Sequence, residues 1–283
     1  MSQISAKEVM ALRDRTNLPM MDCKAALTEA KGDMEKAIQI LRERNKGVSV
    51  KREGRETAEG RIAAFVDPAA QAGAIVELRC ESPMVVKADA FIALSKEIAE
   101  HVATRNAASV ADMLAQPFKG DVSKTVQDRI NEAIGLIREN MKVARFTRLT
   151  GLLGEYVHHD GSVGVLFKAS GANADRQLLR DVCTHITAVV PTPAATRRDE
   201  VPAATVAKEK EIAQAQIAAD PKNASKPANI LEKITEGKLN SWFKENVLVE
   251  QPFVKDDSKT VGQLLKSAGL EAVSFVRYKV GQI

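Results

Sequence analysis

The sequence predicts an α+β protein with a helical N-terminal domain, a duplicated core and an inserted helical arm. The first observation is that residues 4–45 show only helical periodicity. The second is that the chain from Arg61 onward twice gives the pattern strand, strand, helix. The third is a repeated segment, QPFKGDVSKTV at 116–126 and QPFVKDDSKTV at 251–261, which agrees at eight of eleven positions. Because repeated sequence implies repeated structure, we expect two related core subdomains.

Residues 1–46 are expected to form a domain of three short helices. Ser5 and Glu8 have the spacing of a capping box, in which each side chain satisfies a free amide at a helix start. Pro19 indicates where the second helix begins, because proline fits only near a helix start. The KGD segment at 31–33 ends that helix and caps the third.

The rest of the chain is expected to fall into a linker and two subdomains. Residues 47–60 are charged and lack an apolar period, so we expect a mobile linker. The core subdomains are expected at 61–148 and 149–283, the second interrupted by an insertion at about 191–245. Two polar helices with one thin apolar seam predict that this insertion is an antiparallel hairpin that touches a partner. A dimer formed through this arm is an alternative that the pattern leaves open.

The composition disfavours several classes of function. The formal net charge of +4 is small for a dedicated nucleic-acid binder, and 4% aromatic residues leave little for base stacking. No apolar run approaches the ~18 residues needed to span a bilayer. From the charge, the aromatic content and the short apolar runs we expect a protein that binds neither nucleic acid nor membranes. No leader peptide precedes the capping box near Met1, so we expect a cytoplasmic protein.

Patterns typical of reactive sites are missing. Cys23, Cys80 and Cys183 lie far apart and form neither a disulfide framework nor a C-x-x-C metal pair. The histidines lack metal-ligand spacing, and the phosphate loop of nucleotide hydrolases is missing. We therefore expect no metal, no cofactor and no enzyme activity, and no spacing favours the alternative of an enzyme that uses Cys80 or a histidine. The residues by themselves favour an interaction protein.

Motifs near both ends of the chain carry a family resemblance. R-x-x-T, M-M-D-C-K-x-A-L and G-D-x-x-x-A occur at 13–16, 20–27 and 32–37, and QPFVKDDSKTVGQLL occupies 251–265. With these motifs the chain resembles the bacterial elongation factor Ts family over essentially its whole length. The segment IRENMKVAR at 137–145 departs from the family's I-G-E-N-I-x-x-R-R.

The resemblance implies a ubiquitin-associated-like N-terminal domain and a guanine nucleotide exchange factor for elongation factor Tu. The chain would bind the GDP-bound and nucleotide-free forms of that partner and promote GDP release so that GTP can enter. Its binding energy would favour the partner's nucleotide-free conformation. The alternative is a chaperone-like module that binds elongation factor Tu without efficient exchange activity.

The resemblance also implies a partner-binding segment after Cys80. The family usually reads T-D-F-V-A-K there, and its Asp–Phe pair intrudes beside the partner's magnesium site. In this chain Glu81 is followed by Ser82, Pro83, Met84 and Val85, so proline replaces the aspartate and methionine the phenylalanine. Methionine is bulky and apolar enough to keep a wedge role. The alternative is that Met84 packs beneath the first core helix.

The remaining candidate partner-binding residues lie in the N-terminal domain and the second subdomain. The resemblance implies contacts by Leu12, Met20 and Met21. Since adjacent residues cannot point the same way on a helix, we expect one methionine in the core and at least one at the interface. His158 and His185 match family positions near the contact with a distant β-barrel domain of the partner. For His185 a packed, hydrogen-bonded histidine is an equal alternative.

Overall fold

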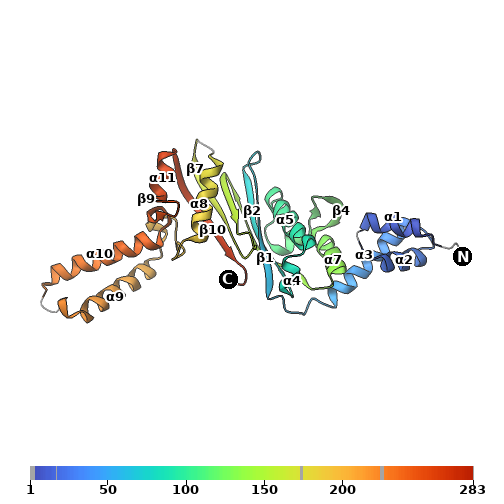
Figure 1. The fold of residues 1–283 in the computed structure, drawn as a ribbon, viewed down its shortest axis with the longest axis horizontal. Coiled ribbons are helices and arrows are strands. Elements are labelled where there is room, and N and C mark those ends of the chain that lie inside the picture. The colour runs from blue at the N-terminus through green and yellow to red at the C-terminus, as the bar shows by residue number, and fades with distance from the viewer. Residues whose placement is uncertain (1–3, 17, 173–174, 224–225, 283) are drawn as a thin grey trace. The chain divides into compact units, whose positions relative to one another are not determined.

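The computed structural model describes residues 4–16, 18–172, 175–223 and 226–282 (Figure 1). The chain divides into two compact units. Unit 1 comprises Met1–Arg148, Val157–Gly164 and Tyr278–Ile283, and unit 2 comprises Leu149–Tyr156 and Val165–Arg277. Two short segments that the sequence assigned to the second subdomain, 157–164 and 278–283, thus belong to the first unit.

The N-terminal domain consists of the three expected helices. They are α1 (Ala6–Thr16), α2 (Met20–Glu29) and α3 (Met34–Val50). The predicted capping box is present, because the Glu8 amide donates to the Ser5 hydroxyl and the Ser5 amide donates to the Glu8 carboxylate. Asp33 caps α3 by accepting from the amides of Glu35 and Lys36. The buried side chains of the three helices form a core of their own, which includes Leu12, Cys23, Leu27 and Leu41.

The predicted linker 47–60 is shorter in the structure, because α3 continues to Val50 and the first strand begins at Glu59. The added turn of helix is stabilised by tertiary packing, since α3 lies against helix α7 (Val126–Ile137) and Val48 packs on the core of unit 1. The local composition could not reveal this contact, because it describes the segment alone.

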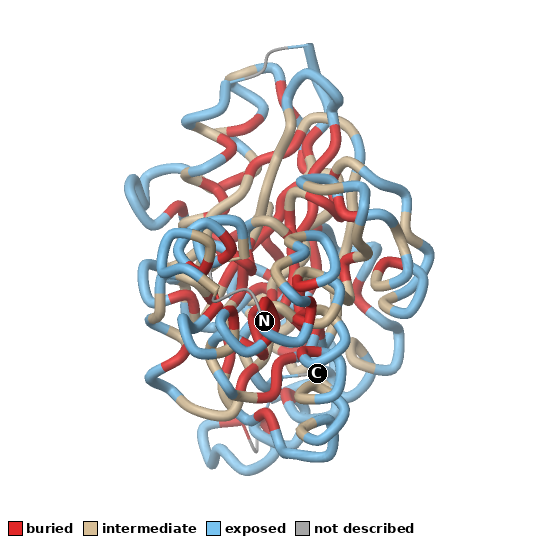
Figure 2. Tube along the Cα trace, turned by 90° about the vertical axis from the view of Figure 1, so that its right-hand side faces the viewer, coloured by how far each residue is buried: buried red, intermediate tan, exposed pale blue. Residues whose placement is uncertain are grey.

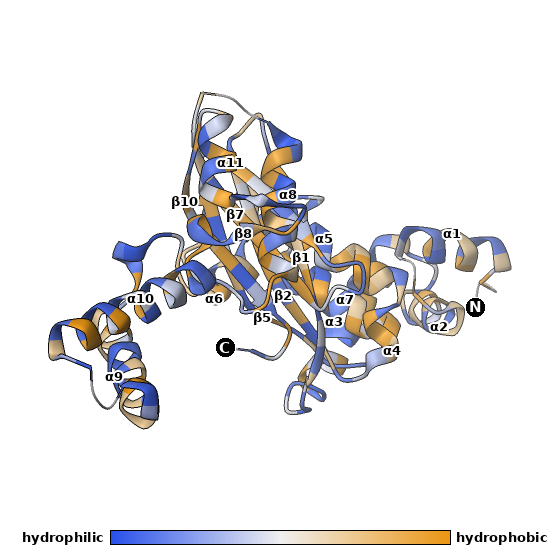
Figure 3. Cartoon of the chain, turned by 60° about the vertical axis from the view of Figure 1, so that its left-hand side comes forward, coloured by the Kyte–Doolittle hydropathy of each residue, from blue (hydrophilic) through white to orange (hydrophobic). Residues whose placement is uncertain are grey.

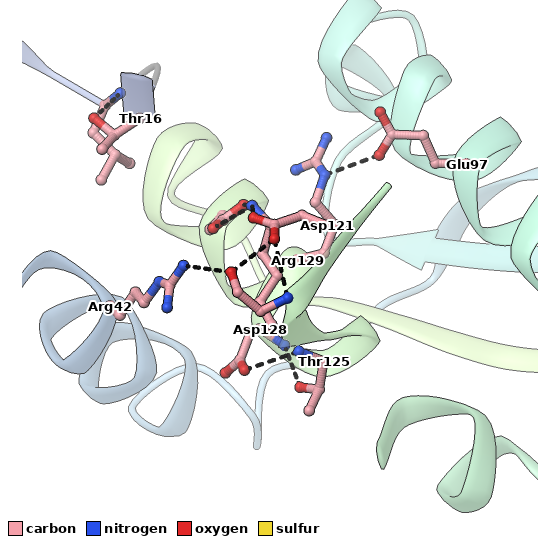
Figure 4. Close-up of polar contacts among 11 residues, drawn as sticks. Thr16, Arg42, Glu97, Asp121, Thr125, Asp128 and Arg129 are labelled. Atoms are coloured by element: carbon pink, nitrogen blue, oxygen red, sulfur yellow. Dashed lines mark hydrogen bonds and ion pairs between the residues drawn. The ribbon is translucent and has the colours of Figure 1, made fainter. Parts of the chain in front are cut away.

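The fit between α3 and α7 depends on a close approach. A β-carbon at Gly135 would overlap the amide group of the Asn45 side chain, so a larger residue there would force that side chain to move. Polar contacts flank this point. Lys46 forms an ion pair with Asp128 at 3.2 Å. Figure 4 shows Arg42 extending from α3, and its guanidinium donates to the Ser123 hydroxyl at 3.4 Å.

The first core subdomain contains a three-stranded sheet in the order β1-β2-β5, in which β1 and β2 are antiparallel. Strand β1 (Glu59–Asp67) and strand β2 (Ala72–Cys80) form the predicted hairpin, and β5 (Met141–Thr150) pairs with β2. Helix α5 (Asp89–Thr104) packs on β1 and β2, and its buried residues share one core with the strands (Figure 3). Figure 2 marks the buried residues of the chain in red. The smaller elements are α4 (Pro83–Val86), α6 (Val110–Ala115), β3 (Pro117–Phe118) and β4 (Asp121–Thr125).

The second subdomain repeats this arrangement. Its sheet has the order β10-β7-β6, formed by β6 (Leu152–Val157), β7 (Val163–Gly171) and β10 (Leu270–Lys279). In both sheets the strand that precedes the helix lies in the middle. The helices and short strands are α8 (Arg176–Ala188), β8 (Pro252–Phe253), β9 (Asp256–Thr260) and α11 (Val261–Ser267).

The duplication extends to a buried histidine in each half. His101 near the end of α5 and His185 near the end of α8 are fully buried. The Nε2 atom of each lies 3.1 Å from the glutamine of the QPF motif, Gln116 or Gln251. The Nδ1 atom accepts a backbone amide from the following hairpin, at 3.3 Å in the first copy and 3.2 Å in the second. Each imidazole is therefore neutral in this arrangement, because Nδ1 must carry a lone pair.

Acid should destabilise both units through these histidines. Burial lowers the pKa of His101 and of His185, so the unfolded chain binds more protons than the folded one. The free energy of unfolding keeps its full value with respect to these histidines above a pH of about 6.5. It decreases as the pH falls below that, by at most about 1.4 kcal/mol per pH unit for each histidine. Denaturant unfolding between pH 5 and 8 measures this slope. A His101→Gln, His185→Gln variant should have a flatter profile; an unchanged slope would contradict the assignment.

The arm of unit 2 is a helical hairpin, formed by α9 (Ala203–Ala219) and α10 (Ala228–Asn246). Its base is held by polar contacts: Arg198 pairs with Glu250, donates to Asn240 at 2.8 Å and stacks over the Phe243 ring. Three short 3₁₀ turns flank the helices, at Arg198–Glu200, Pro221–Asn223 and Leu248–Glu250. The arm has exposed isoleucines, and pairing of two copies through it stays a prediction.

Candidate partner-binding surface

The segment after Cys80 is a short helical turn that begins with a proline. Ser82 occupies the N-cap position of α4, and Pro83 is suited to the first turn because its missing amide has no partner to lose there. The Ser82 side chain does not cap the helix. Instead, its hydroxyl donates to Glu139 Oε1 at 2.6 Å, and its amide donates to Glu139 Oε2 at 3.0 Å. One carboxylate thus fixes the start of the turn.

Glu81 ties the same segment to two further parts of the chain. The Asn140 amide donates to Glu81 Oε1 at 2.5 Å, and Arg55 lies 3.4 Å from Oε2. The Asn140 side chain in turn donates to the carbonyls of Glu53 and Arg55 at 3.3 and 2.9 Å. The turn is therefore mounted on the residues that follow α7 and on those that follow α3.

Met84 points away from this support. Its side chain is 83% exposed, whereas the neighbouring Val85 is buried in the core of unit 1. The structure therefore rejects the alternative that Met84 packs beneath the first core helix. It also corrects the assignment of Val85 as a direct contact, because this side chain serves as the anchor of the turn. An exposed methionine on a fixed turn can enter an apolar pocket of another molecule.

The methionines of α2 are both exposed, Met20 by 42% and Met21 by 71%. The expectation that one of them lies in the core is wrong. The buried face of α2 is formed by Cys23, Ala26 and Leu27, and both methionines precede that face at the start of the helix. Leu12 is also corrected: it is fully buried and packs in the core of the N-terminal domain.

The two methionine segments are connected by a short chain of contacts within unit 1. Asp22, in the first turn of α2, forms an ion pair with Arg138 at 2.6 Å. The next residue, Glu139, holds Ser82 at the start of α4. The structure thus links the N-terminal domain to the Met84 turn through two consecutive residues after α7. We call the exposed side chains of Met20, Met21 and Met84 the methionine surface.

The two candidate histidines lie in different units. His158 belongs to unit 1, is partly exposed, and its Nδ1 atom lies 2.8 Å from Asp160 Oδ1. Its turn continues into Gly161, whose carbonyl accepts the Ile62 amide of β1 at 2.8 Å. His185 is fully buried in unit 2, so it cannot touch a partner directly; the packed alternative describes it correctly.

The titratable groups near α4 show no sign of an activated nucleophile. Burial, reinforced by the charge of Glu139, raises the pKa of the Cys80 thiol to about 12, and a thiol that stays protonated is a poor nucleophile. The described part of the chain holds no cluster of three or more His, Cys, Asp or Glu side chains suited to a metal ion. Among the described residues, no helix has the length and apolar character that crossing a membrane requires.

Several supporting residues were missed at the level of sequence. Glu139 and Asn140 were noted only as part of a segment that departs from the family pattern, although they hold α4 in place. His101 was not matched with His185, because fifteen residues separate His101 from its glutamine and sixty-six separate His185 from its own. The QPF repeat was the signal that would have paired them.

The three-helix domain, the duplicated core and the inserted arm define a multidomain α+β protein, and Met20, Met21 and Met84 of the methionine surface are exposed to solvent. The family model described as "Elongation factor TS" matches residues 81–282. A protein named elongation factor Ts from Thiobacillus denitrificans is 41% identical over 284 residues, covering 100% of this chain and 93% of that protein. Proteins of the same name from Methylococcus capsulatus and Trichlorobacter lovleyi are 41% and 39% identical, covering 99% and 94% of this chain and 92% and 86% of theirs. The chain belongs to the elongation factor Ts family of translation elongation factors.

Proposed function

We propose that this chain is a guanine nucleotide exchange factor for elongation factor Tu. The observation that carries the proposal is the mounting of Met84, whose exposed side chain stands on a turn held by Glu139 and Asn140. Because the backbone of the turn is already ordered, binding costs little backbone entropy there, so contact energy made by Met84 can be used to displace groups of the partner. The family resemblance places a phenylalanine at this position.

In the proposed mechanism this chain makes and breaks no covalent bond. The partner holds GDP and magnesium, and the chain binds most tightly to the partner's nucleotide-free conformation. By reciprocity, the factor by which this chain weakens GDP binding equals the factor by which GDP weakens the binding of this chain. GDP therefore leaves faster in the complex, and incoming GTP in turn releases the chain. Translation elongation would place this work in the cytoplasm.

The N-terminal domain supplies the second contact of the proposal. Met20 and Met21 are joined to the Met84 turn through Asp22, Arg138 and Glu139. A partner that covers these segments and the arm would bury more than about 2,000 Å² in total, a size typical of large signalling assemblies. His158 is a further contact candidate because its ring is partly exposed.

The test is the release of fluorescent GDP from the cognate elongation factor Tu. We expect micromolar concentrations of this chain to accelerate release, with saturation as the complex fills. The second candidate, a binding module without exchange activity, is favoured by Pro83, which supplies no carboxylate where the family has aspartate. Tight complex formation without faster release would select that candidate. Neither binding nor release would reject both.

A further inference from the structure

Arg138 has an unusual backbone conformation for its residue type. It follows α7 with φ 67° and ψ 24°, in the left-handed region, and its amide donates to the Ile134 carbonyl at 2.8 Å. Glycine adopts this conformation without cost, whereas an arginine is strained there by its β-carbon. Such strain persists where the surroundings hold the residue in place. Arg138 is therefore a position at which contacts oppose the local preference.

Three contacts meet at the left-handed turn formed by Arg138 and Glu139, which we call the corner. The Arg138 guanidinium forms the ion pair with Asp22, and the Arg138 carbonyl accepts the Arg52 guanidinium at 2.9 Å. The adjoining Glu139 holds Ser82. Among the described residues, the Asp22–Arg138 pair is the polar side-chain contact that α2 makes with the core. The corner thus touches α2, the residues after α3 and the Met84 turn.

We propose that Arg138 is a positioning residue that docks the first turn of α2, with Met20 and Met21, beside the Met84 turn. The proposal rests on the proposed function, in which the partner meets both parts of the methionine surface. The third helix of the N-terminal domain is already held by its packing on α7. The ion pair adds a second attachment at α2, so that the partner finds this helix already oriented and less ordering is needed on binding.

Glycine is the informative substitution at this position. Arg138→Gly keeps the left-handed corner, and with it Glu139 and the Met84 turn, but removes the guanidinium. We expect an unchanged or higher melting temperature, because the strain is relieved and an exposed ion pair contributes little stability. The concentration of this chain that gives half-maximal GDP release should rise by about two- to fivefold, the factor expected for one exposed ion pair. The maximal rate should not change.

Charge exchange separates the ion pair from the other roles of the corner. Asp22→Arg and Arg138→Asp should each raise the half-maximal concentration, and the double variant should recover the original value. Aspartate is tolerated in the left-handed region, so the corner survives in these variants. Arg44→Ala is the matched control. It removes the Arg44–Glu29 pair, which is similarly exposed but lies within the N-terminal domain, and should change nothing.

A measurement that needs no partner distinguishes this inference from the exchange proposal. Spin labels at Lys24→Cys and Lys142→Cys, both exposed, report the separation of α2 from the core, and the three native cysteines are buried. Arg138→Gly should broaden the distance distribution, and the charge-exchange pair should narrow it again. An unchanged distribution, or a fall in both melting temperature and maximal rate, would overturn the positioning role. If the unsubstituted chain does not accelerate GDP release from elongation factor Tu, the exchange proposal is rejected. The distance measurement still tests whether Arg138 orients α2 against the core.

Discussion

Replacing Met84 with alanine is expected to slow GDP release from elongation factor Tu at saturating concentration by about tenfold or more. An interface residue that fills a pocket of its partner commonly contributes 1.4 kcal/mol or more on truncation, roughly a tenfold change. Because Met84 is 83% exposed in the free chain, the substitution removes little packing. The free energy of unfolding should change by no more than about 0.5 kcal/mol. Stopped-flow release of fluorescent GDP and denaturant unfolding measure the two quantities.

The matched control is Met10→Ala, the same substitution at an exposed methionine of α1. It should leave both the rate and the stability near those of the parent chain. The two substitutions should also differ in kind. Met84→Ala should lower the maximal rate of GDP release, whereas Arg138→Gly should lower the apparent affinity for the partner. Equal maximal rates for Met84→Ala and the parent would reject the wedge role and leave a binding surface without it.

The duplication could be predicted from sequence because it is written almost literally in the chain. The two QPF segments form equivalent hairpins, each followed by a helix with a capping box, at Thr125 in the first copy and Thr260 in the second. The helical arm was predictable from propensity, and the three-helix domain from its caps. These features depend on neighbouring residues, which a sequence displays directly.

The direction of single side chains could not be predicted with the same success. Methionine suits both a core and a contact surface, so Met84 and Met20 were ambiguous until the buried faces of α4 and α2 were known. Leu12 was expected to contact the partner because the family resemblance implies contacts by its helix, yet its side chain is buried inside the domain. The role of Glu139 depends on Ser82, fifty-seven residues away in the chain. Long-range pairs of this kind leave no local pattern.

The second large effect is expected at Glu77, in the middle of β2. Its side chain is 2% exposed, and its carboxylate accepts from Arg79 at 2.9 Å, from Arg145 at 2.7 Å and from the Gly281 amide at 3.0 Å. The Arg145 guanidinium also lies over the Tyr278 ring, 4.1 Å from its centroid. One buried charge therefore joins β2, β5 and the C-terminal residues that belong to unit 1.

Glu77→Ala should lower the free energy of unfolding of unit 1 by about 3 kcal/mol, because it leaves two arginines without their buried counter-charge. Amide hydrogen exchange at Val280 and Gly281 should accelerate, since the tail loses the acceptor for Gly281. Glu100→Ala is the control: this carboxylate pairs with Lys119 on the surface, and its loss should cost less than about 1 kcal/mol.

The pH dependence supplies a separate check on the same residue. Burial tends to raise the pKa of Glu77, but the hydrogen bonds from Gly281, Arg79 and Arg145 outweigh it and hold this pKa below its ordinary value. The unfolded chain therefore takes up the proton first, so the stabilisation is complete above a pH of about 4.3 and is lost as the pH falls below that. Glu77→Gln removes this titration, and its unfolding profile between pH 3 and 5 should be flatter than that of the parent chain. Two outcomes would contradict this role: parallel pH profiles for Glu77→Gln and the parent chain, or a loss of less than about 1 kcal/mol in the free energy of unfolding for Glu77→Ala. Either would show that the arginines find water or other acceptors and that this carboxylate does not hold the C-terminal residues in place.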